Sequence, residues 1–502
     1  MKNIEIPESK DLYVINPDYI LKHDEKRCLI MTGSGFQCEK STHDWMSIIH
    51  PAQAMILSFF SNPDTLKNII NNLCVFLELS EEDVTNLINP FIENPKALGN
   101  KFNDYLLGFP PNIIIKYEKH LEILHTYLPE EFIYKQLDFK TVRLIKSPAM
   151  LSLMVTNRCA TNCVYCYADK KEDISCQIPF ERIKEIIKEA KSLRVKDFAV
   201  AGGEYFLYEK WYELLCELKE NGFEKNFIST KIPIKENVIV KLKEFPKLTF
   251  QFSFDSLQID ILSKLLGVSG NYLENMKNTL HNMDKHGLPY QVISVLTKLN
   301  IDKTDLTEMY NFLCTLKNIT HWDTRIAYRS LYSTVNFDKI KLNQEEAADI
   351  YTFLNEFNNN KKLKVRTDNS NFEKGFYEAE NGSKSFRGGS CSANRSHMFI
   401  LPDGNVTICE QMYWKKRFII GNILKSGIEE IWNSPESLKW ANMTSNDFRE
   451  ESACKKCEIL DDCYNKYPNK CWADTLKVYG DENWDFPDPR CNKAPKMIFD
   501  LI

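Results

Sequence analysis

The chain has 502 residues, 43% hydrophobic and 26% charged, which is enough apolar surface for packed cores and excludes a mainly disordered protein. The net charge of −5 gives no basic footprint, so neither nucleic acid nor an anionic membrane is expected as a partner. No stretch approaches the roughly 20 apolar residues that span a bilayer, and residues 1–19 lack a signal-peptide pattern. We therefore expect a cytoplasmic protein of several domains.

Residues 1–95 are expected to form a small α+β unit. Short strands are predicted at 12–15, 19–21 and 28–31, followed by helices that begin near Pro51, Thr65 and Ser80. Ser80 has the character of a helix N-cap residue, with Asp83 three positions later. Strands followed by three short helices predict a winged-helix-like module, and the alternative is a helical cap on the next domain. Residues 96–147 are expected to bridge the two.

Strands and helices alternate over residues 148–335. Strands are predicted at 150–156, 197–200, 227–229, 248–254 and 290–296, with helices at 183–190 and 211–219. This order predicts an α/β fold with a parallel sheet, in which ligands bind at the carboxyl ends of the strands. Residues 336–385 are polar and are expected to be a linker, and residues 386–502 form a cysteine-rich C-terminal domain.

The 16 cysteines of the chain are unevenly spaced. In a reducing compartment, metal or cluster ligation explains them better than disulfides do. Cys159, Cys163 and Cys166 follow the predicted strand 150–156 with the spacing CxxxCxxC. Three thiolates on one loop can bind three irons of a [4Fe–4S] cube and leave the fourth iron open. The alternative is zinc, for which Cys176 is the only further cysteine nearby.

This loop resembles the signature of the radical S-adenosylmethionine (SAM) enzymes, and the resemblance implies a partial (β/α)6 barrel. It implies that Tyr165 lies beside the adenine, and that Gly202, Gly203 and Glu204 bind the methionine amino group. Glycine suits such a place because the backbone must approach the ligand closely. The family often has proline next, where this chain has Tyr205. Ser253 and Asp255 resemble positions near the SAM ribose and methionine, and the alternative is a strand-terminal turn.

A second cysteine series begins at Cys391 and continues with Cys409, Cys454, Cys457, Cys463, Cys471 and Cys491. With the segments 402–404, 421–423 and 431–433, it resembles the SPASM extension of peptide-modifying radical SAM enzymes, which carries two auxiliary [4Fe–4S] clusters. Seven residues separate Cys463 from Cys471, where relatives commonly have three. The alternative for such CxxC spacing is a pair of zinc ribbons.

The resemblance implies a ligand set for each auxiliary cluster. Cys454, Cys457, Cys463 and Cys491 would complete one cluster. Cys391, Cys409 and Cys471 would hold the other, whose fourth iron is then open or bound by a residue other than cysteine. Glu410 follows Cys409 directly. In sulfatase-maturing relatives a carboxylate at this place takes a proton from the substrate, and the alternative is an ordinary solvated loop residue.

The first functional hypothesis is an oxidoreductase that matures a ribosomally synthesised precursor peptide. The resemblance implies that SAM is cleaved reductively to a 5′-deoxyadenosyl radical, which abstracts a substrate hydrogen. The expected product is a thioether between cysteine sulfur and carbon, with a C–C link or epimerisation left open. The N-terminal unit resembles the precursor-recognition (PqqD-like) element that binds a leader peptide, and the electron donor would be a flavodoxin or ferredoxin. The alternatives are a sulfatase-maturing-type radical SAM enzyme and a non-enzymatic zinc-binding protein.

Overall fold

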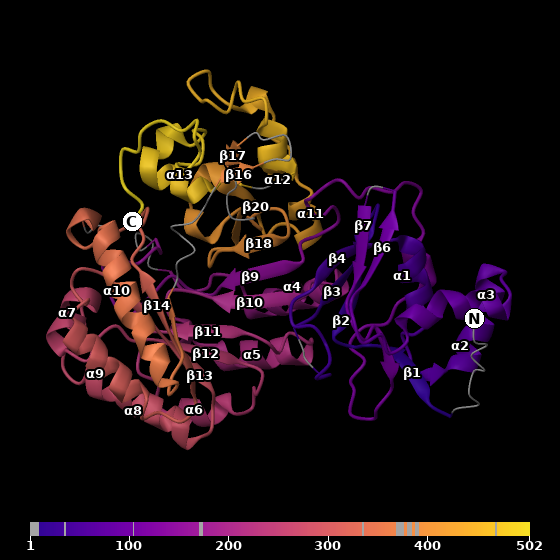
Figure 1. The fold of residues 1–502 in the computed structure, drawn as a ribbon, viewed down its shortest axis with the longest axis horizontal. Coiled ribbons are helices and arrows are strands. Elements are labelled where there is room, and N and C mark those ends of the chain that lie inside the picture. Colours follow the sequence, from indigo (N-terminus) through magenta and orange to yellow (C-terminus); the bar gives the residue numbers. More distant parts are fainter. Residues whose placement is uncertain are drawn as a thin grey trace.

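We describe the protein as a computed structural model, which covers residues 10–34, 37–103, 105–169, 174–333, 336–367, 376–378, 384–386, 391–466 and 469–502. Figure 1 shows three units: an N-terminal one in indigo and purple, a central barrel in magenta and orange, and a C-terminal one that ends in yellow. The barrel lies between the other two in the chain and contacts both.

The N-terminal unit has the strands and helices that the sequence predicts. They are β1 (Leu12–Ile15), β2 (Tyr19–His23), β3 (Cys28–Thr32), α1 (Pro51–Ser58), α2 (Leu66–Leu77) and α3 (Glu81–Ile88). The Ser80 side chain accepts a hydrogen bond from the backbone N–H of Asp83, as expected of an N-cap. Strand β4 (Met46–Ile49), which the sequence analysis does not predict, completes the antiparallel sheet β2-β3-β4.

Residues 96–147 contribute to this same unit as well as bridging to the next. They form β6 (Leu98–Phe102), β7 (Tyr105–Phe109) and β8 (Ile114–Lys116). Strand β8 pairs antiparallel with β1, whose other neighbour is the short strand β5 (Asp64–Thr65). Phe109, Ile114 and Phe132 are buried in one cluster with the α1 and α2 side chains. The N-terminal core therefore extends beyond residue 95.

Buried charges in and after β2 fix the N-terminal unit to the start of the barrel. The Asp24 carboxylate accepts the backbone N–H groups of Ile145 and Lys146, each at 2.7 Å, and pairs with Arg27 at 2.9 Å. Lys22 donates to the Ser147 hydroxyl at 2.6 Å, and burial lowers the pKa of this lysine to about 7. These contacts are all shielded from water, so they hold the two units in one arrangement.

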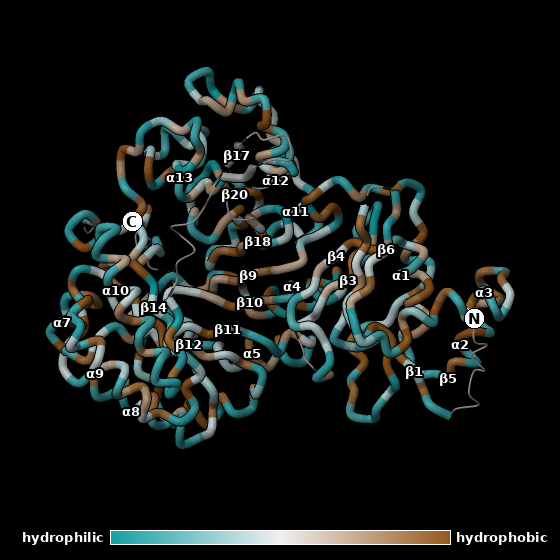
Figure 2. Tube along the Cα trace, viewed as in Figure 1, coloured by the Kyte–Doolittle hydropathy of each residue, from teal (hydrophilic) through white to brown (hydrophobic). Residues whose placement is uncertain are grey.

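The central unit is the expected partial (β/α)6 barrel. Its parallel strands are β9 (Met150–Met154), β10 (Asp197–Ala201), β11 (Phe227–Thr230), β12 (Thr249–Ser253), β13 (Tyr290–Leu296) and β14 (Ile319–Ile326). The covering helices are α4 (Phe180–Ser192), α5 (Trp211–Glu220), α6 (Glu236–Leu242), α7 (Ile259–Leu266), α8 (Tyr272–Lys285) and α9 (Lys303–Leu313). Figure 2 shows hydrophobic and hydrophilic residues alternating along these helices, as amphipathic helices require.

A side chain, not a backbone ladder, joins β10 to β11. Asn226 accepts the backbone N–H of Val200 at 2.9 Å and donates to the carbonyl of Phe198, also at 2.9 Å. The amide of one asparagine thus replaces a pair of backbone hydrogen bonds between the two strands. It keeps the six strands in a single curved wall.

Residues 336–385 are not a simple linker, which corrects the expectation for this segment. They contain α10 (Gln344–Glu356) and β15 (Val365–Thr367), which pairs parallel with β14. Ala347, Ile350, Tyr351 and Leu354 form the buried face of α10 at helical spacing. The high polarity of the surrounding residues conceals this stripe in the sequence. The short strands β16 (Phe376–Glu378) and β17 (Lys384–Phe386) pair antiparallel.

The C-terminal unit continues the barrel wall. Strand β18 (His397–Ile400) pairs parallel with β9 and is followed in the sheet by β19 (Asn405–Thr407) and β20 (Ile419–Asn422). Helices α11 (Ile428–Trp432), α12 (Pro435–Ala441) and α13 (Trp472–Tyr479) complete it. Because β18 lies directly beside β9, the second cysteine region is placed next to the first. Among the described residues no helix is both long and apolar enough to cross a membrane.

Candidate functional site

The CxxxCxxC loop leaves the carboxyl end of β9 and is fixed against α7. The backbone N–H groups of Asn162 and Val164 donate to carbonyl oxygens in the last turn of α7, at 2.7 and 2.9 Å. The loop carries Cys159, Cys163 and Cys166, all partly buried. It therefore lies at the edge of the sheet where parallel α/β folds bind their ligands.

The three thiols of this loop lie close together. The Thr161 hydroxyl is 3.3 Å from the Sγ atoms of both Cys159 and Cys163. Burial raises the pKa of the Cys163 thiol, and the neighbouring Cys166 raises it further. Thiols must lose their protons to bind a metal, so cluster binding would release protons here. A hydroxyl between two sulfurs can also donate to them when they are thiolates.

The donor set of this loop is three thiols on one short segment. A structural zinc site usually has four protein ligands. Three thiolates can bind three irons of a cube and leave the fourth iron open, so the residues present fit a [4Fe–4S] cluster.

Gly202 and Gly203 lie directly against the backbone of the cysteine loop. A Cβ atom on Gly202 would be 2.7 Å from the Thr156 carbonyl oxygen, and one on Gly203 would be 2.3 Å from that of Arg158. The N–H of Gly203 donates to Thr156 at 2.6 Å. Glycine is therefore required here because the segment packs against the backbone of the cysteine loop. The sequence had suggested a different reason, close contact with a ligand.

Glu204 is buried at the end of this segment, with 1% of its surface exposed. Its carboxylate accepts hydrogen bonds from the Thr230 hydroxyl at 2.9 Å and from the backbone N–H of Lys231 at 3.1 Å. Burial raises the pKa of Glu204 to about 7, although these hydrogen bonds lower it in part. The carboxyl group thus ties β10 to the end of β11.

Tyr165, Lys231 and Asp255 form a buried polar group at the mouth of the barrel. The Tyr165 hydroxyl donates to Asp255 Oδ2 at 2.5 Å, and Lys231 Nζ lies 3.0 Å from the same oxygen and 2.7 Å from the tyrosine oxygen. Burial and the adjacent Asp255 raise the pKa of Tyr165 well above its usual value, so it stays protonated. The group links the cysteine loop to the ends of β11 and β12.

The structure gives Asp255 a specific role beyond a strand-terminal turn. Its other oxygen accepts the backbone N–H of Val295 at 2.8 Å, so this single carboxylate joins the loop to β13 as well. Ser253 is the last residue of β12, two positions earlier, and is buried. Lys231 is absent from the sequence analysis. Its position just after a predicted strand was the signal that could have identified it, since all parallel strands end at this edge.

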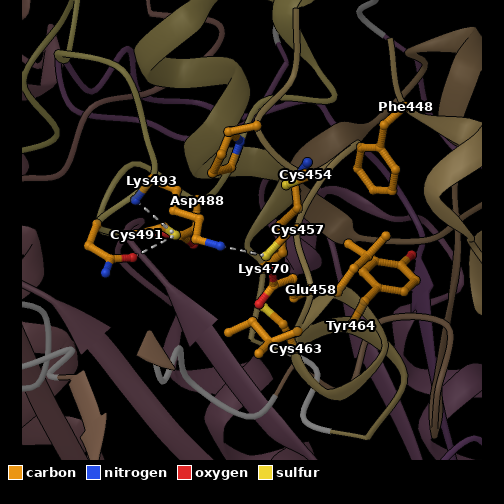
Figure 3. A pocket seen from close by; sticks show the side chains of 15 residues that line it. Phe448, Cys454, Cys457, Glu458, Cys463, Tyr464, Lys470, Asp488, Cys491 and Lys493 are labelled. Atoms are coloured by element: carbon orange, nitrogen blue, oxygen red, sulfur yellow. Dashed lines mark hydrogen bonds between the residues drawn. The ribbon is translucent and has the colours of Figure 1, made fainter. Parts of the chain in front are cut away.

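The cavity in Figure 3 gathers four cysteines of the C-terminal unit: Cys454, Cys457, Cys463 and Cys491. Its volume is about 160 Å³. Lys493 Nζ lies 3.4 Å from the Cys457 sulfur at the rim. The size of this cavity and its four thiols fit a cluster.

Cys391, Cys409 and Cys471 lie near one another. Burial raises the pKa of Cys409 to about 12, and the next largest cause is the charge of Cys391. Cys409 in turn contributes to the raised pKa of Cys471 after burial and two carboxylates. Cys409 follows β19 and Cys471 directly precedes α13. Each of the two sets thus has members close to one another, and the assignment of a cluster to each set stays a prediction.

Glu410 lies beside Cys409, in a short turn over Glu410–Met412. Burial raises the pKa of its carboxyl group. Its charge also contributes to the raised pKa of Tyr167, which belongs to the segment after Cys166. Glu410 is thus partly buried and lies near Tyr167, on which Cys166 and Cys409 also act.

Two regions of the chain match known domains. Residues 153–313 match the radical SAM superfamily, and residues 391–458 match the SPASM iron–sulfur cluster-binding domain. The second match is to a cluster-binding domain and not to a zinc ribbon. The first match contains Cys159, Cys163 and Cys166, and the second contains Cys391, Cys409, Cys454 and Cys457 but ends before Cys463, Cys471 and Cys491.

Similar proteins match most of the chain or its middle part. Mycofactocin maturase MftC of Mycolicibacterium smegmatis is 24% identical over 351 residues, which cover 70% of this chain and 84% of MftC. A probable GTP 3′,8-cyclase of Methanothermobacter marburgensis is 25% identical over 162 residues, so the chain spans about half of that relative. The structure of Streptococcus suis SuiB bound to precursor peptide SuiA has a TM-score of 0.63 at 14% identity and covers 95% of this chain and 99% of SuiB. The fold is shared over nearly the whole chain.

Proposed function

We propose that this chain, which carries a radical SAM domain and a SPASM domain, modifies a ribosomally synthesised precursor peptide and joins a cysteine sulfur of that peptide to a carbon atom. The observation that carries the proposal is that the three-cysteine loop and the C-terminal cysteines meet: Cys166 and Cys409 both act on the pKa of Tyr167, and four further cysteines line one cavity of the C-terminal unit. The relatives support a peptide as substrate, since MftC is named a maturase and SuiB is described bound to a precursor peptide.

The radical SAM domain binds a [4Fe–4S] cluster and SAM, and the SPASM domain binds auxiliary iron–sulfur clusters. When bound, these groups supply the one-electron chemistry that removes a hydrogen atom from a substrate. We assign the first cluster to Cys159, Cys163 and Cys166, with one iron left open for SAM. Gly202 and Gly203 let the SAM-binding segment pack against the cysteine loop, and Glu204 fixes the end of that segment.

In this proposal the cysteine loop is held at the mouth of the barrel by Tyr165, Lys231 and Asp255. Their hydrogen bonds hold the cysteine loop at a fixed distance from β11, β12 and β13. A site built on strand ends and locked by buried hydrogen bonds positions its ligands more accurately than a mobile loop does. Ser253, at the end of β12, completes the group that we assign to SAM.

The auxiliary clusters are assigned to the two cysteine groups of the C-terminal unit. Cys454, Cys457, Cys463 and Cys491 surround one cavity and supply four thiolates. Cys391, Cys409 and Cys471 supply three, which leaves a place for a substrate thiol on the second cluster. The electron donor in this proposal is a flavodoxin or ferredoxin, since the first cluster must be reduced from outside the chain.

The N-terminal unit is the candidate binding site for a leader peptide. It has two three-stranded sheets with short strands, and an extended peptide can add to the edge of such a sheet. The buried contacts of Asp24 fix this unit to residues just before β9. A leader bound there would hold the rest of the peptide at a high local concentration near the barrel.

The test of the proposed function is anaerobic incubation of the reconstituted protein with SAM, a reductant and a cysteine-containing precursor peptide. We expect release of 5′-deoxyadenosine and a peptide whose mass falls by that of two hydrogen atoms. The modified peptide should also have one fewer thiol that reacts with iodoacetamide. The same peptide without its leader should react much more slowly at low concentration, since tethering can raise effective affinity by about 10²–10⁴. Mass loss with all thiols still reactive would contradict the thioether, and equal rates with and without the leader would contradict the role of the N-terminal unit.

Glu410 is the proposed general base that takes a proton from the substrate. Glu410→Gln should lower peptide modification by about 10²–10⁴ and leave SAM cleavage intact, because the base acts after the hydrogen atom is removed. The raised pKa means that the basic form is populated only at higher pH, so the modification rate should rise with pH in the wild type. Glu430→Gln, at an exposed position on α11, is the matched control. Equal losses of SAM cleavage and peptide modification in E410Q would rule out this role.

A further inference from the structure

Two cavities of the C-terminal unit share a wall. The first is lined by Cys454, Cys457, Cys463 and Cys491, and the second by Cys391. Lys470 and Tyr464 line both of them. These two side chains therefore stand between the sites assigned above to the two auxiliary clusters. Tyr464 is neutral, because burial raises the pKa of its hydroxyl and keeps it protonated.

Lys470 is a buried lysine that forms no ion pair with a carboxylate among the described residues. Its exposed fraction is 7%, and its Nζ donates to the carbonyl oxygen of Trp484 at 3.2 Å. The ammonium also lies 3.8 Å from the ring centroid of Trp472. Among the ion pairs of the described residues, none includes Lys470. The Phe448 ring centroid is 5.4 Å from the same ammonium. A buried ammonium held by a carbonyl and aromatic rings, without an ion pair, is costly.

The nearby carboxylates are already paired with arginines. Burial lowers the pKa of Lys470 to about 8, and the nearby cysteine sulfurs and the carboxylates of Asp485 and Asp488 raise it in part. Asp485 pairs with Arg449 at 2.5 Å, and Asp488 pairs with Arg490 at 2.8 Å. The remaining groups of opposite charge that face Lys470 are the cysteine sulfurs, which become thiolates when they bind a cluster. The lysine is therefore arranged to compensate cluster charge.

We propose that Lys470 places a fixed positive charge between the two auxiliary clusters and raises their reduction potentials. Reduction by one electron adds one negative charge to a cluster, and a cation in a site of low dielectric stabilises that charge strongly. Net charge and solvent exposure are among the factors that set the potential of an iron–sulfur cluster. The inference depends on the presence of the auxiliary clusters and not on the identity of the substrate.

Lys493 provides a matched control on the same cavity. Its Nζ is 3.4 Å from the sulfur of Cys457, so it is also close to a proposed ligand. Its side chain is exposed to solvent, however, whereas Lys470 is buried. Water and salt screen an exposed charge much more than a buried one. Removing the charge of Lys493 should therefore change the cluster potential less.

The experiment compares the full-length, anaerobically reconstituted wild type with Lys470→Met, Lys470→Arg and Lys493→Met. Iron and sulfide are quantified in each, and the auxiliary clusters are titrated redox-potentiometrically with detection by electron paramagnetic resonance. Methionine preserves the length and apolar stem of lysine, and arginine preserves its charge. We expect a lower potential for at least one auxiliary cluster in K470M, a potential near that of the wild type in K470R, and a smaller shift in K493M.

Three results would overturn the proposal. They are an unchanged potential in K470M, a shift in K493M as large as that in K470M, and cluster loss in both K470M and K470R. The last would mean that the side chain supports the fold of the site and not its potential. Because no peptide is added, failure of this inference and failure of the proposed peptide reaction are separate outcomes.

Discussion

Cys163→Ala should abolish the reductive cleavage of SAM. Cys163 lies between the other two cysteines of the loop, and its sulfur shares the Thr161 hydroxyl with Cys159. In the proposed assignment Cys163 is one of three cluster ligands, and its loss leaves too few thiolates for the cluster to be retained. Since loss of groups that merely support metal ligands typically costs 10–100-fold, loss of a ligand should cost at least about 100-fold. The measurement is 5′-deoxyadenosine formed under anaerobic conditions with dithionite, together with iron per chain.

Cys176→Ala is the matched control for this prediction. Cys176 is the nearest cysteine in sequence outside the motif, it is also partly buried, and its thiol donates to the Ile178 carbonyl at 3.7 Å. It is the residue that would close a four-cysteine zinc site. C176A should keep wild-type iron content and SAM cleavage. If C176A and C163A lost activity equally, the three-cysteine assignment with an open iron would be wrong.

Gly203→Ala should lower SAM cleavage nearly as much as Cys163→Ala does, although it removes no proposed ligand. The new Cβ would lie 2.3 Å from the Arg158 carbonyl oxygen and 2.6 Å from the carbonyl group of Asn157. Both are backbone atoms of the cysteine loop, so no side-chain rotation can relieve the clash. The loop must move, and a displacement of about 1 Å in an active site can cost about 10²-fold in rate. The overpacking itself should cost about 1–3 kcal/mol of stability.

The measurements for G203A are SAM cleavage, iron content and the midpoint of urea unfolding. Gly99→Ala in strand β6 is the control, since its Cβ would meet only the Leu106 side chain at 3.5 Å, an ordinary contact. G99A should change neither cleavage nor iron content. Wild-type cleavage by G203A would show that the two loops are not packed as described, and that glycine is not required there.

Local patterns allowed much of the fold to be predicted. The strands that become β9, β12 and β13 are short apolar runs, and Ser80 marks the start of α3 through its capping hydrogen bond. Helix α10 was missed because its buried stripe lies within a polar segment. Strand β4 was missed because only Ile49 in it is fully buried, so its pattern is weak. Each error concerns an element whose burial depends on distant partners.

For the candidate site, local motifs could be predicted from the sequence, but contacts between distant residues could not. The cysteines of the first loop lie within eight positions, so their spacing is visible in the sequence. The contacts that fix the loop are not visible, because Lys231 and Asp255 lie far from Tyr165 along the chain. For Gly202 and Gly203, the sequence correctly indicated that the backbone is closely approached, but it attributed that approach to a ligand. Only the fold reveals that the nearest atoms are those of the cysteine loop.

The sequence by itself determined the chemistry available to this protein. Thiol groups at fixed local spacing after a buried strand define what can be bound, since that spacing survives in any fold that keeps the strand and loop. The tertiary structure alone decided which distant groups act together. It brought Cys491 to Cys454, Cys457 and Cys463, and placed Lys470 between two cavities. The physical reason is that burial and charge compensation depend on packing between segments far apart in the chain, which no local periodicity records.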